Sequence, residues 1–200
     1  MTDAYLTLTA PASARITRER SRFVALVFPA STREEVEEAL SRVRHKYHDA
    51  SHRPSAYRLF ALPAPITRTD DDGEPAGSAG RPILREVEAR DLYDVLAVVV
   101  RYFGGTKLGL GGLARAYADA TREALAAAQI GTTQRRLRLR ITCPPDLLPV
   151  VLALVGRHGL SVERTAYGEV VASVAPTRLR RFREALTEGT GARAHCEEAP

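Results

Sequence analysis

Five glycines and one lysine lie between a strongly apolar segment and an alanine-rich segment, and these residues are the best candidates for chemistry in the chain. The apolar segment 95–100 has the composition of a buried strand, and the alanine-rich segment has helical periodicity. A glycine-rich turn that leads into a helix exposes backbone N–H groups, which can bind an anion. The sequence therefore predicts an anion site in and around this turn. Its candidate residues are Arg101, Gly104, Gly105, Lys107, Gly109, Gly111, Gly112 and Arg115.

Two well-known phosphate-binding motifs are excluded at this glycine-rich loop. A Walker loop needs Gly-Lys followed by Ser or Thr, whereas Lys107 is preceded by Thr106 and followed by Leu108. A Rossmann fingerprint is excluded because the elements expected downstream do not continue a dinucleotide-binding unit. A tight strand-to-helix connection that only packs against the sheet remains the alternative to anion binding.

An acidic run precedes the apolar segment, in a stretch rich in glycine and proline. Its candidate metal ligands or general bases are Asp71, Asp72 and Glu74. Carboxylate oxygens are the ligands that Mg²⁺ prefers, so this run would hold the ion against a phosphate on the glycine-rich loop. The alternative is a solvated loop, or ion pairs to Arg101 or Lys107. No cofactor other than this Mg²⁺ is expected.

Three histidines, at positions 45, 48 and 52, are spaced three and four residues apart. They do not predict a metal site, because His52 lies beyond the expected helix end and no cysteine or carboxylate set completes the ligands. His52, Asp49 and Ser78 do not predict a hydrolytic triad either, since the sequence has no nucleophile elbow. His52 and Ser78 are therefore kept as motif residues, and no catalytic residue is assigned.

Arginines alternate with apolar residues after position 135. Alternate residues of a strand share a face, so Arg136, Arg138 and Arg140 would form a basic row. Such a row can follow a nucleic-acid backbone, and a solvated sheet edge is the alternative. Stacking aromatic residues are almost absent from this region, so neither sequence-specific RNA recognition nor DNA sequence specificity is expected.

The hydrophobic periodicity predicts an α+β fold. Strands are expected at 5–9, 14–20, 23–28, 55–62 and 92–102, and helices at 33–47, 82–90 and 112–129. The first helix follows the capping box Thr32-Arg33-Glu34-Glu35. The last of these helices is expected to stop at Gly131, a natural C-cap. Residues 63–80 are expected to form a loop, and a hairpin turn is expected at Ser21-Arg22.

A domain boundary is expected near residues 131–136, which gives domains 1–132 and 133–200. The second domain should contain strands at 137–142, 161–167, 169–174 and 192–197, and helices at 146–158 and 177–187. This βαββαβ order is typical of the ferredoxin-like split-βαβ motif.

Composition excludes several classes of protein. The chain has 200 residues, 44% hydrophobic and 26% charged, which are ordinary values for a soluble globular protein. No apolar run approaches the roughly 18–20 residues of a membrane span, and the N-terminus does not resemble a signal peptide. Two cysteines indicate no disulfide framework. We therefore expect a cytoplasmic protein with no membrane partner, and the net charge of +5 favours anionic partners.

Two long segments resemble the IMPACT/YigZ family, in its bacterial form. They are DDGEPAGSAGRPIL at 71–84 and VVRYFGGTKLGLGGLARAY at 99–117. Arg20-Ser21-Arg22-Phe23 and Asp49-Ala50-Ser51-His52 are similar to two shorter motifs of the family, Lys-Ser-x-Phe and Asp-Ala-x-His. The family often has a cysteine two residues after that histidine. Pro54 stands there in this chain, so thiol chemistry is not expected at this point.

The resemblance implies a fold for both domains. The first should share the α+β fold of ribosomal-protein domains and GHMP kinases, with a left-handed crossover. The second should be similar to the last domain of elongation factor G. Eukaryotic relatives modulate translation through the general-control kinase pathway, and no reaction is firmly attached to the bacterial branch.

Residues and resemblance together predict a cytoplasmic, translation-linked regulator that binds RNA, the ribosome or a translation-associated protein. Binding would use the basic surface and the glycine-rich loop. The alternative is a phosphate- or nucleotide-binding enzyme that uses this loop together with the acidic run. Enzymatic activity is left undecided, with a non-enzymatic protein favoured.

Overall fold

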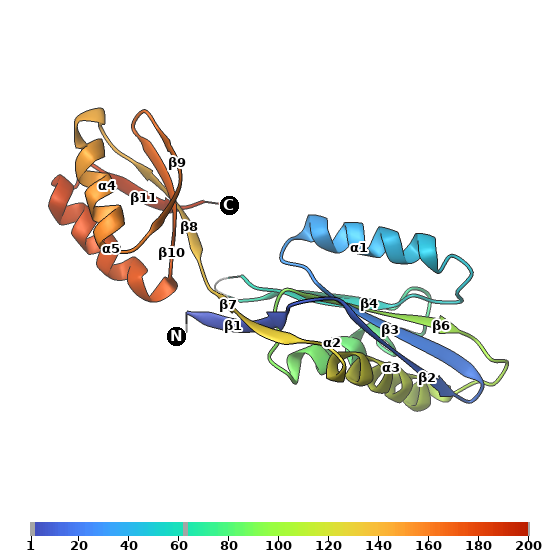
Figure 1. The fold of residues 1–200 in the computed structure, drawn as a ribbon. Coiled ribbons are helices and arrows are strands. Elements are labelled where there is room, and N and C mark those ends of the chain that lie inside the picture. The colour runs from blue at the N-terminus through green and yellow to red at the C-terminus, as the bar shows by residue number, and fades with distance from the viewer. Residues whose placement is uncertain (1–2, 62–63, 200) are drawn as a thin grey trace. The chain divides into compact units, whose positions relative to one another are not determined.

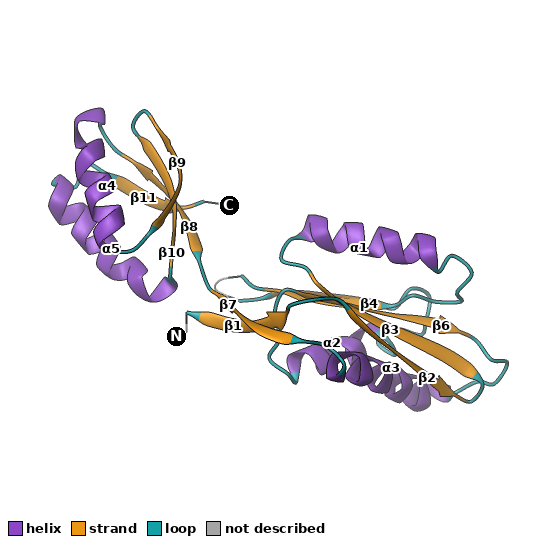
Figure 2. Ribbon diagram, viewed as in Figure 1, coloured by secondary structure: helices purple, strands orange, loops and turns teal. Residues whose placement is uncertain are grey.

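The strands of the computed structural model, which describes residues 3–61 and 64–199, lie in three sheets within those ranges (Figures 1 and 2). The mixed α+β fold predicted from the sequence is confirmed. The chain divides into two compact units. The first unit contains residues 6–132, and the second contains residues 133–199 together with residues 3–5, which the sequence analysis had grouped with the first domain. No helix among the described residues is long and apolar enough to cross a membrane.

An antiparallel five-stranded sheet forms the centre of the first unit, in the order β2-β3-β6-β4-β5. Its strands are β2 (Ala12–Arg18), β3 (Ser21–Pro29), β4 (Ser55–Leu59), β5 (Ile66–Asp70) and β6 (Val95–Tyr102). Three helices cover its two faces. They are α1 (Arg33–Lys46) on one face, and α2 (Gly80–Glu88) and α3 (Gly109–Ala126) on the other (Figure 1).

The central strand β6 connects two hydrophobic cores, because its side chains point alternately to the two faces of the sheet. Val95, Ala97 and Val99 pack in the core that contains α2 and α3. Leu96, Val98 and Val100 pack in the core beneath α1. A strand that is buried on both faces explains why the sequence shows an uninterrupted apolar run here.

Helix α1 begins as its capping box predicts. The Thr32 hydroxyl accepts a hydrogen bond from the Glu35 backbone N–H at 3.2 Å. The Glu35 carboxylate accepts from the Ser31 backbone N–H at 2.6 Å and from the Ser31 hydroxyl at 3.0 Å. Thr32 therefore caps a backbone N–H group that the helix start leaves unpaired, while Glu35 holds Ser31, the residue before the N-cap.

Several predicted boundaries are wrong. Strand β5 lies inside the predicted loop 63–80, and all five of its residues are exposed, so no alternation marks it in the sequence. Helix α3 ends at Ala126, and Gly131 belongs to β7 (Ile130–Gln134), which forms a two-stranded sheet with β1 (Ala4–Leu8). The β2–β3 turn lies at residues 19–20, which have positive φ, two residues before the predicted turn at Ser21-Arg22. The predicted end of β4 at Leu62 lies outside the described residues.

The second unit has the predicted order of elements and an antiparallel sheet in the order β11-β8-β10-β9. The elements are β8 (Leu137–Thr142), a short 3₁₀ turn (Pro145–Leu147), α4 (Leu148–Arg157), β9 (Ser161–Ala166), β10 (Glu169–Val174), α5 (Pro176–Thr190) and β11 (His195–Glu198). Leu139, Ile141, Val151 and Phe182 are fully buried in its core, so α4 and α5 pack against one face of the sheet.

Candidate functional site

The glycine-rich loop connects the end of β6 to the start of α3, as predicted. Gly104 lies against the β2–β3 turn, where a Cβ atom would be 2.1 Å from the carbonyl carbon of Arg20. Its backbone N–H donates to the Ser21 hydroxyl at 3.2 Å. Gly109 begins α3 with a φ of +66°, a conformation that side chains disfavour. Close packing therefore explains Gly104, and backbone conformation explains Gly109.

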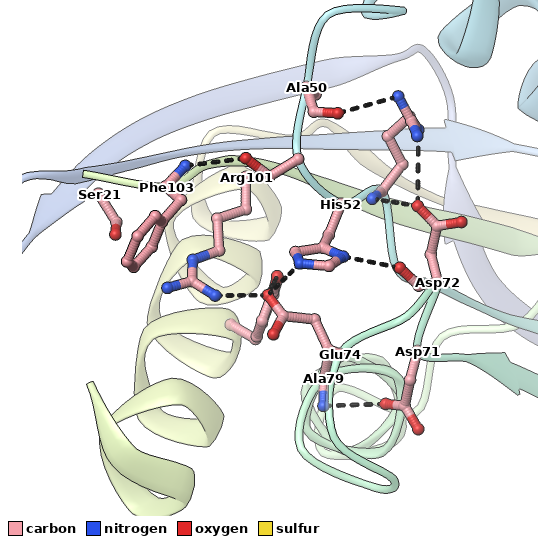
Figure 3. A network of polar contacts seen from close by, with 12 residues as sticks. Ser21, Ala50, His52, Asp71, Asp72, Glu74, Ala79, Arg101 and Phe103 are labelled. Carbon is pink, nitrogen blue, oxygen red and sulfur yellow. Dashed lines mark hydrogen bonds and ion pairs between the residues drawn. The ribbon is translucent and has the colours of Figure 1, made fainter. Parts of the chain in front are cut away.

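The Asp71 carboxylate holds the acidic loop against the start of α2. It accepts hydrogen bonds from the backbone N–H groups of Gly77 at 2.7 Å and Gly80 at 2.8 Å. It also accepts one from the Ala79 N–H at 3.0 Å (Figure 3). Burial alone would raise the pKa of this carboxyl group, but the three N–H groups bring the pKa below its ordinary value. Asp71 is thus engaged by the protein backbone.

Asp72 orients the segment between α1 and β4. Its carboxylate accepts from the Arg53 backbone N–H at 2.7 Å and lies 3.5 Å from the Arg53 Nε atom. Its carbonyl oxygen lies 2.8 Å from His52 Nδ1. Within residues 3–61 and 64–199, no group of three His, Cys, Asp or Glu side chains is placed to hold a metal ion. The Mg²⁺ site suggested for this loop stays a prediction.

Glu74 and Arg101 bring the two long sequence segments together in a buried ion pair. Arg101 Nη1 donates to Glu74 Oε1 at 2.7 Å, and only 7% and 4% of the two side chains are exposed (Figure 3). The Tyr117 hydroxyl donates to the same oxygen at 2.6 Å. Burial, and then the neighbouring carboxylate, raise the pKa of Tyr117, which keeps its proton on the hydroxyl. The alternative interpretation of the acidic run, that Arg101 pairs with Glu74, is confirmed.

His52 lies beside this pair. Its Nδ1 atom must donate to the Asp72 carbonyl, because a carbonyl oxygen only accepts. In the neutral ring the lone pair is therefore on Nε2, which lies 4.0 Å from Glu74 Oε1. The backbone of His52 is fixed by an antiparallel bridge to Arg101. His52 thus presents Nε2 towards the buried carboxylate.

The other residues of the hypothetical triad do not join His52. The Asp49 carboxylate accepts from the Tyr102 hydroxyl at 2.9 Å. Ser78 is buried, and its hydroxyl oxygen has no hydrogen-bond partner in the described part of the chain. Neither Asp49 nor Ser78 is therefore a hydrogen-bond partner of His52 in the described residues.

A pocket of about 380 Å³ opens above the Glu74–Arg101 pair. Its lining residues are His52, Glu74, Pro75, Arg101, Phe103, Lys107, Leu108, Gly109, Leu110 and Leu113. Most of the wall is apolar, and the polar side chains are few, which is typical of a small-molecule site. Phe103 and Leu110 are 50% and 65% exposed, so they form part of the rim.

Three features make this pocket suitable for a polar or anionic ligand. Lys107 lines it, is exposed, and forms no ion pair with the residues that the structure describes. Helix α3 begins at it with no side-chain cap, so the first backbone N–H groups are available at the positive end of the helix. Arg101 is only 6% exposed, yet its Nε atom has no hydrogen-bond partner within the described residues.

The remaining predicted basic residues lie elsewhere. Arg115 is exposed on α3 and does not line the pocket. In the second unit, Arg138 pairs with Glu163 at 2.8 Å, and Arg140 lies 3.5 Å from Glu169 and 3.6 Å from Glu197. Arg136 donates to the Ser161 hydroxyl at 3.0 Å. Acidic neighbours thus compensate much of the charge of the predicted basic row.

Sequence reasoning missed the apolar part of the pocket. In the sequence, Phe103, Leu108 and Leu110 stand out only as part of the segment that resembles the family. The burial of Tyr117 and its hydrogen bond to Glu74 are not predicted from the sequence. The tyrosine among apolar residues of this helix could have predicted a buried polar partner, because a buried tyrosine hydroxyl usually forms a hydrogen bond.

Comparison with known proteins agrees with this architecture. The Impact N-terminal domain family model matches residues 19–125. YvyE of Bacillus subtilis, an IMPACT family member, is 39% identical over 137 residues, which cover 68% of this chain and 62% of YvyE. The chain thus spans less than two thirds of that relative. YigZ of Escherichia coli is 33% identical over 160 residues, which cover 78% of this chain and 76% of YigZ.

A crystal structure of a hypothetical protein superimposes with a TM-score of 0.72 and 26% sequence identity, covering 100% of this chain and 99% of that one. The matched segment 19–125 contains the whole glycine-rich loop and the whole Glu74 network. The family model and both relatives therefore lead to the same assignment: the chain belongs to the IMPACT family.

Proposed function

We propose that this protein is a cytoplasmic, translation-linked regulator that binds RNA or the ribosome through the pocket at its glycine-rich loop. Membership of the IMPACT family supports the link to translation, since the family's eukaryotic members modulate translation. The observation that carries the binding proposal is the convergence of Lys107, the uncapped start of α3 and Arg101 on one pocket. A phosphate group is the ligand that a lysine and free helix N–H groups bind best.

We assign the main contact to the loop rather than to the arginine row. The acidic partners of Arg138 and Arg140 would have to be displaced before these side chains could neutralise phosphates. Lys107 has no such competitor in the described residues. The loop therefore offers more uncompensated positive charge per basic residue than the arginine row does.

The finer fold assignment belongs to the same proposal. The βαββαβ order of the second unit and its sheet order β11-β8-β10-β9 support a ferredoxin-like domain, similar to the last domain of elongation factor G. The assignment of the first unit to the fold of ribosomal-protein domains and GHMP kinases, with a left-handed crossover, is inferred from the family resemblance.

The alternative, an enzyme that uses the acidic run as metal ligand or general base, has less support. Asp71 already accepts three backbone hydrogen bonds, and Glu74 is buried against Arg101 and Tyr117. A base must reach the proton that it removes, and a metal ligand must reach the ion. Both carboxylates are held by the protein instead.

Co-sedimentation with ribosomes on sucrose gradients tests the proposal. Wild-type protein should migrate with ribosomes at low salt and leave them at high salt, because phosphate contacts release counterions. Lys107→Glu should abolish association, whereas Lys46→Glu should not, since Lys46 lies on α1 away from the pocket. These are the two lysines of the chain, so they form a matched pair.

Two further measurements show which part of the protein contacts the ribosome and whether the partner is RNA. Changing Arg136, Arg138 and Arg140 together to Glu should have the smaller effect. If this triple variant alone loses ribosomes, the contact belongs to the second unit and our assignment to the loop is wrong. Binding that survives RNase treatment would indicate a translation-associated protein as partner. A wild-type protein that stays at the top of the gradient at low salt would overturn the proposal.

A further inference from the structure

The charges of the pocket are separated between its floor and its rim. On the floor, the positive charge of Arg101 is matched by the Glu74 carboxylate 2.7 Å away, so the buried pair carries no net charge. On the rim, Lys107 and the uncapped start of α3 are positive and have no acidic partner in the described part of the chain. An anionic group is therefore favoured at the rim, and a neutral polar group on the floor.

The floor also has hydrogen-bonding groups that the protein leaves unused. Arg101 Nε is buried and has no acceptor within the described residues. Arg101 and Tyr117 both donate to Oε1 of Glu74, and no hydrogen bond to Oε2 is found there. A buried, unpaired donor is costly, and Nε has no exposed surface in this structure, so a ligand gains this hydrogen bond only where the Arg101 side chain turns Nε towards the pocket.

The side walls fit a largely apolar body that can stack on an aromatic ring. The Phe103 ring lies 5.4 Å from the Arg101 guanidinium carbon, and Figure 3 shows the guanidinium between this ring and the His52 imidazole. Leu108, Leu110 and Leu113 complete the apolar lining. The exposed Phe103 ring is available for stacking, which is how single nucleic-acid bases are commonly held.

We propose that the pocket binds one nucleotide, with the base on the Arg101–Glu74 floor against Phe103 and the phosphate at Lys107 and the start of α3. A base edge carries both donors and acceptors, which match Glu74 Oε2 and Arg101 Nε. The volume of about 380 Å³ lies in the range of small-ligand pockets. This inference rests on the proposed function in using the same loop, and it specifies which part of an RNA enters. The nucleotide comes either from RNA or from the free pool.

Calorimetric titration of the full chain with nucleotide fragments tests the inference. The probes are AMP, GMP, CMP and UMP, with ribose 5-phosphate as phosphate without base and the four nucleosides as base without phosphate. At least one mononucleotide should bind roughly tenfold or more tightly than both of its fragments, as expected when stacking and phosphate contacts act together. Ribose 5-phosphate that binds as tightly as every mononucleotide would overturn the placement of the base.

Variants separate the contributions of floor, wall and rim. Phe103→Ala should weaken mononucleotide binding roughly tenfold by removing the stacking surface. Arg101→Lys should also weaken it, through the altered buried pair with Glu74 as well as through the loss of Nε. Lys107→Ala should weaken mononucleotides and ribose 5-phosphate alike. Lys46→Ala and Arg115→Ala are the matched controls and should change nothing. Because Phe103 and Lys107 are exposed, their variants retain the fold, and unchanged affinity in both would refute the site.

A short single-stranded RNA distinguishes the source of the nucleotide. If RNA binds more tightly than its mononucleotides and Phe103→Ala weakens both, the pocket receives a nucleotide of an RNA strand. If mononucleotides bind but neither RNA nor ribosomes do, the pocket stands and the translation-linked proposal fails. If RNA binds with Phe103→Ala behaving as wild type and no mononucleotide binds, the nucleotide pocket is wrong while the proposed function stands.

Discussion

Removal of the Glu74 carboxylate should destabilise the first unit far more than removal of a surface carboxylate. In Glu74→Leu, Arg101 keeps its charge in a site where only 7% of its side chain is exposed, and the Tyr117 hydroxyl loses its acceptor. Breaking one side of a buried ion pair typically costs about 3–5 kcal/mol, because the remaining charge is left uncompensated. We expect a loss of about this size in the free energy of unfolding.

Urea unfolding at neutral pH, followed by circular dichroism, measures this loss. Glu38→Leu is the control, because Glu38 forms an ion pair with Arg42 at 3.6 Å in which the two side chains are 73% and 68% exposed. An exposed pair of this kind contributes about 0.2–1 kcal/mol. A Glu74→Leu variant that unfolds within about 1 kcal/mol of Glu38→Leu would show that the buried pair does not stabilise the fold as argued.

A double variant checks the physical cause. Glu74→Leu combined with Arg101→Met removes both charges, and apolar replacement of a whole buried pair is often close to neutral. The double variant should therefore be more stable than either single variant. If the two single losses simply add, the coupling between Glu74 and Arg101 is absent and the explanation fails.

Three other predictions concern neighbouring contacts. The pKa of Asp71 is lowered in the folded protein, so its carboxylate stabilises the fold fully above the ordinary pKa of 3.8. This stabilisation is lost as the pH falls through the lowered pKa. In Asp71→Asn, the free energy of unfolding should therefore fall less steeply at acid pH than in the wild type. Gly104→Ala should cost about 1–3 kcal/mol in urea unfolding through its clash with Arg20, whereas Gly111→Ala, whose Cβ meets open space in α3, should gain about 0.5–1 kcal/mol. The raised pKa of Tyr117 predicts that Tyr117→Phe leaves the phenolate absorbance of the folded protein unchanged in alkaline titration and lowers it only after unfolding.

The sequence predicted those elements whose burial produces a clear pattern. The run 95–100 is apolar on both faces of the sheet, and its composition predicts the buried strand that the structure contains. Strand β5 was missed because every residue in it is exposed, so hydrogen bonding to β4 alone defines it. Strand β7 was missed because Gly131 looks like a helix stop when its pairing with β1 is unknown.

The site was predictable in its parts but not in its assembly. The glycine-rich loop and the acidic run were both identified, and their meeting through Glu74 and Arg101 was one of two alternatives. Local patterns do not report which of several carboxylates lies nearest to a given arginine, since that distance depends on the packing of α2 and α3. The exposure of Phe103, which makes it a candidate for stacking, also depends on tertiary structure.

Because Glu74 is buried, only some residues of the pocket can be substituted to change ligand binding without also changing stability. Glu74 and Arg101 hold the two long segments together, so a substitution at either residue changes the fold and the pocket floor through the same contact. Lys107 and Phe103 line the same pocket but are exposed, and in the described residues neither forms a hydrogen bond or ion pair with Glu74 or Arg101, although the Phe103 ring lies 5.4 Å from the Arg101 guanidinium carbon. A substitution of Lys107 or Phe103 that weakens binding therefore identifies a contact with the ligand. A substitution of Glu74 that weakens binding can act through the ligand contact or through lost stability. For the same reason, loss of binding in a Glu74 variant would not by itself identify a general base, because loss of the buried pair predicts the same result.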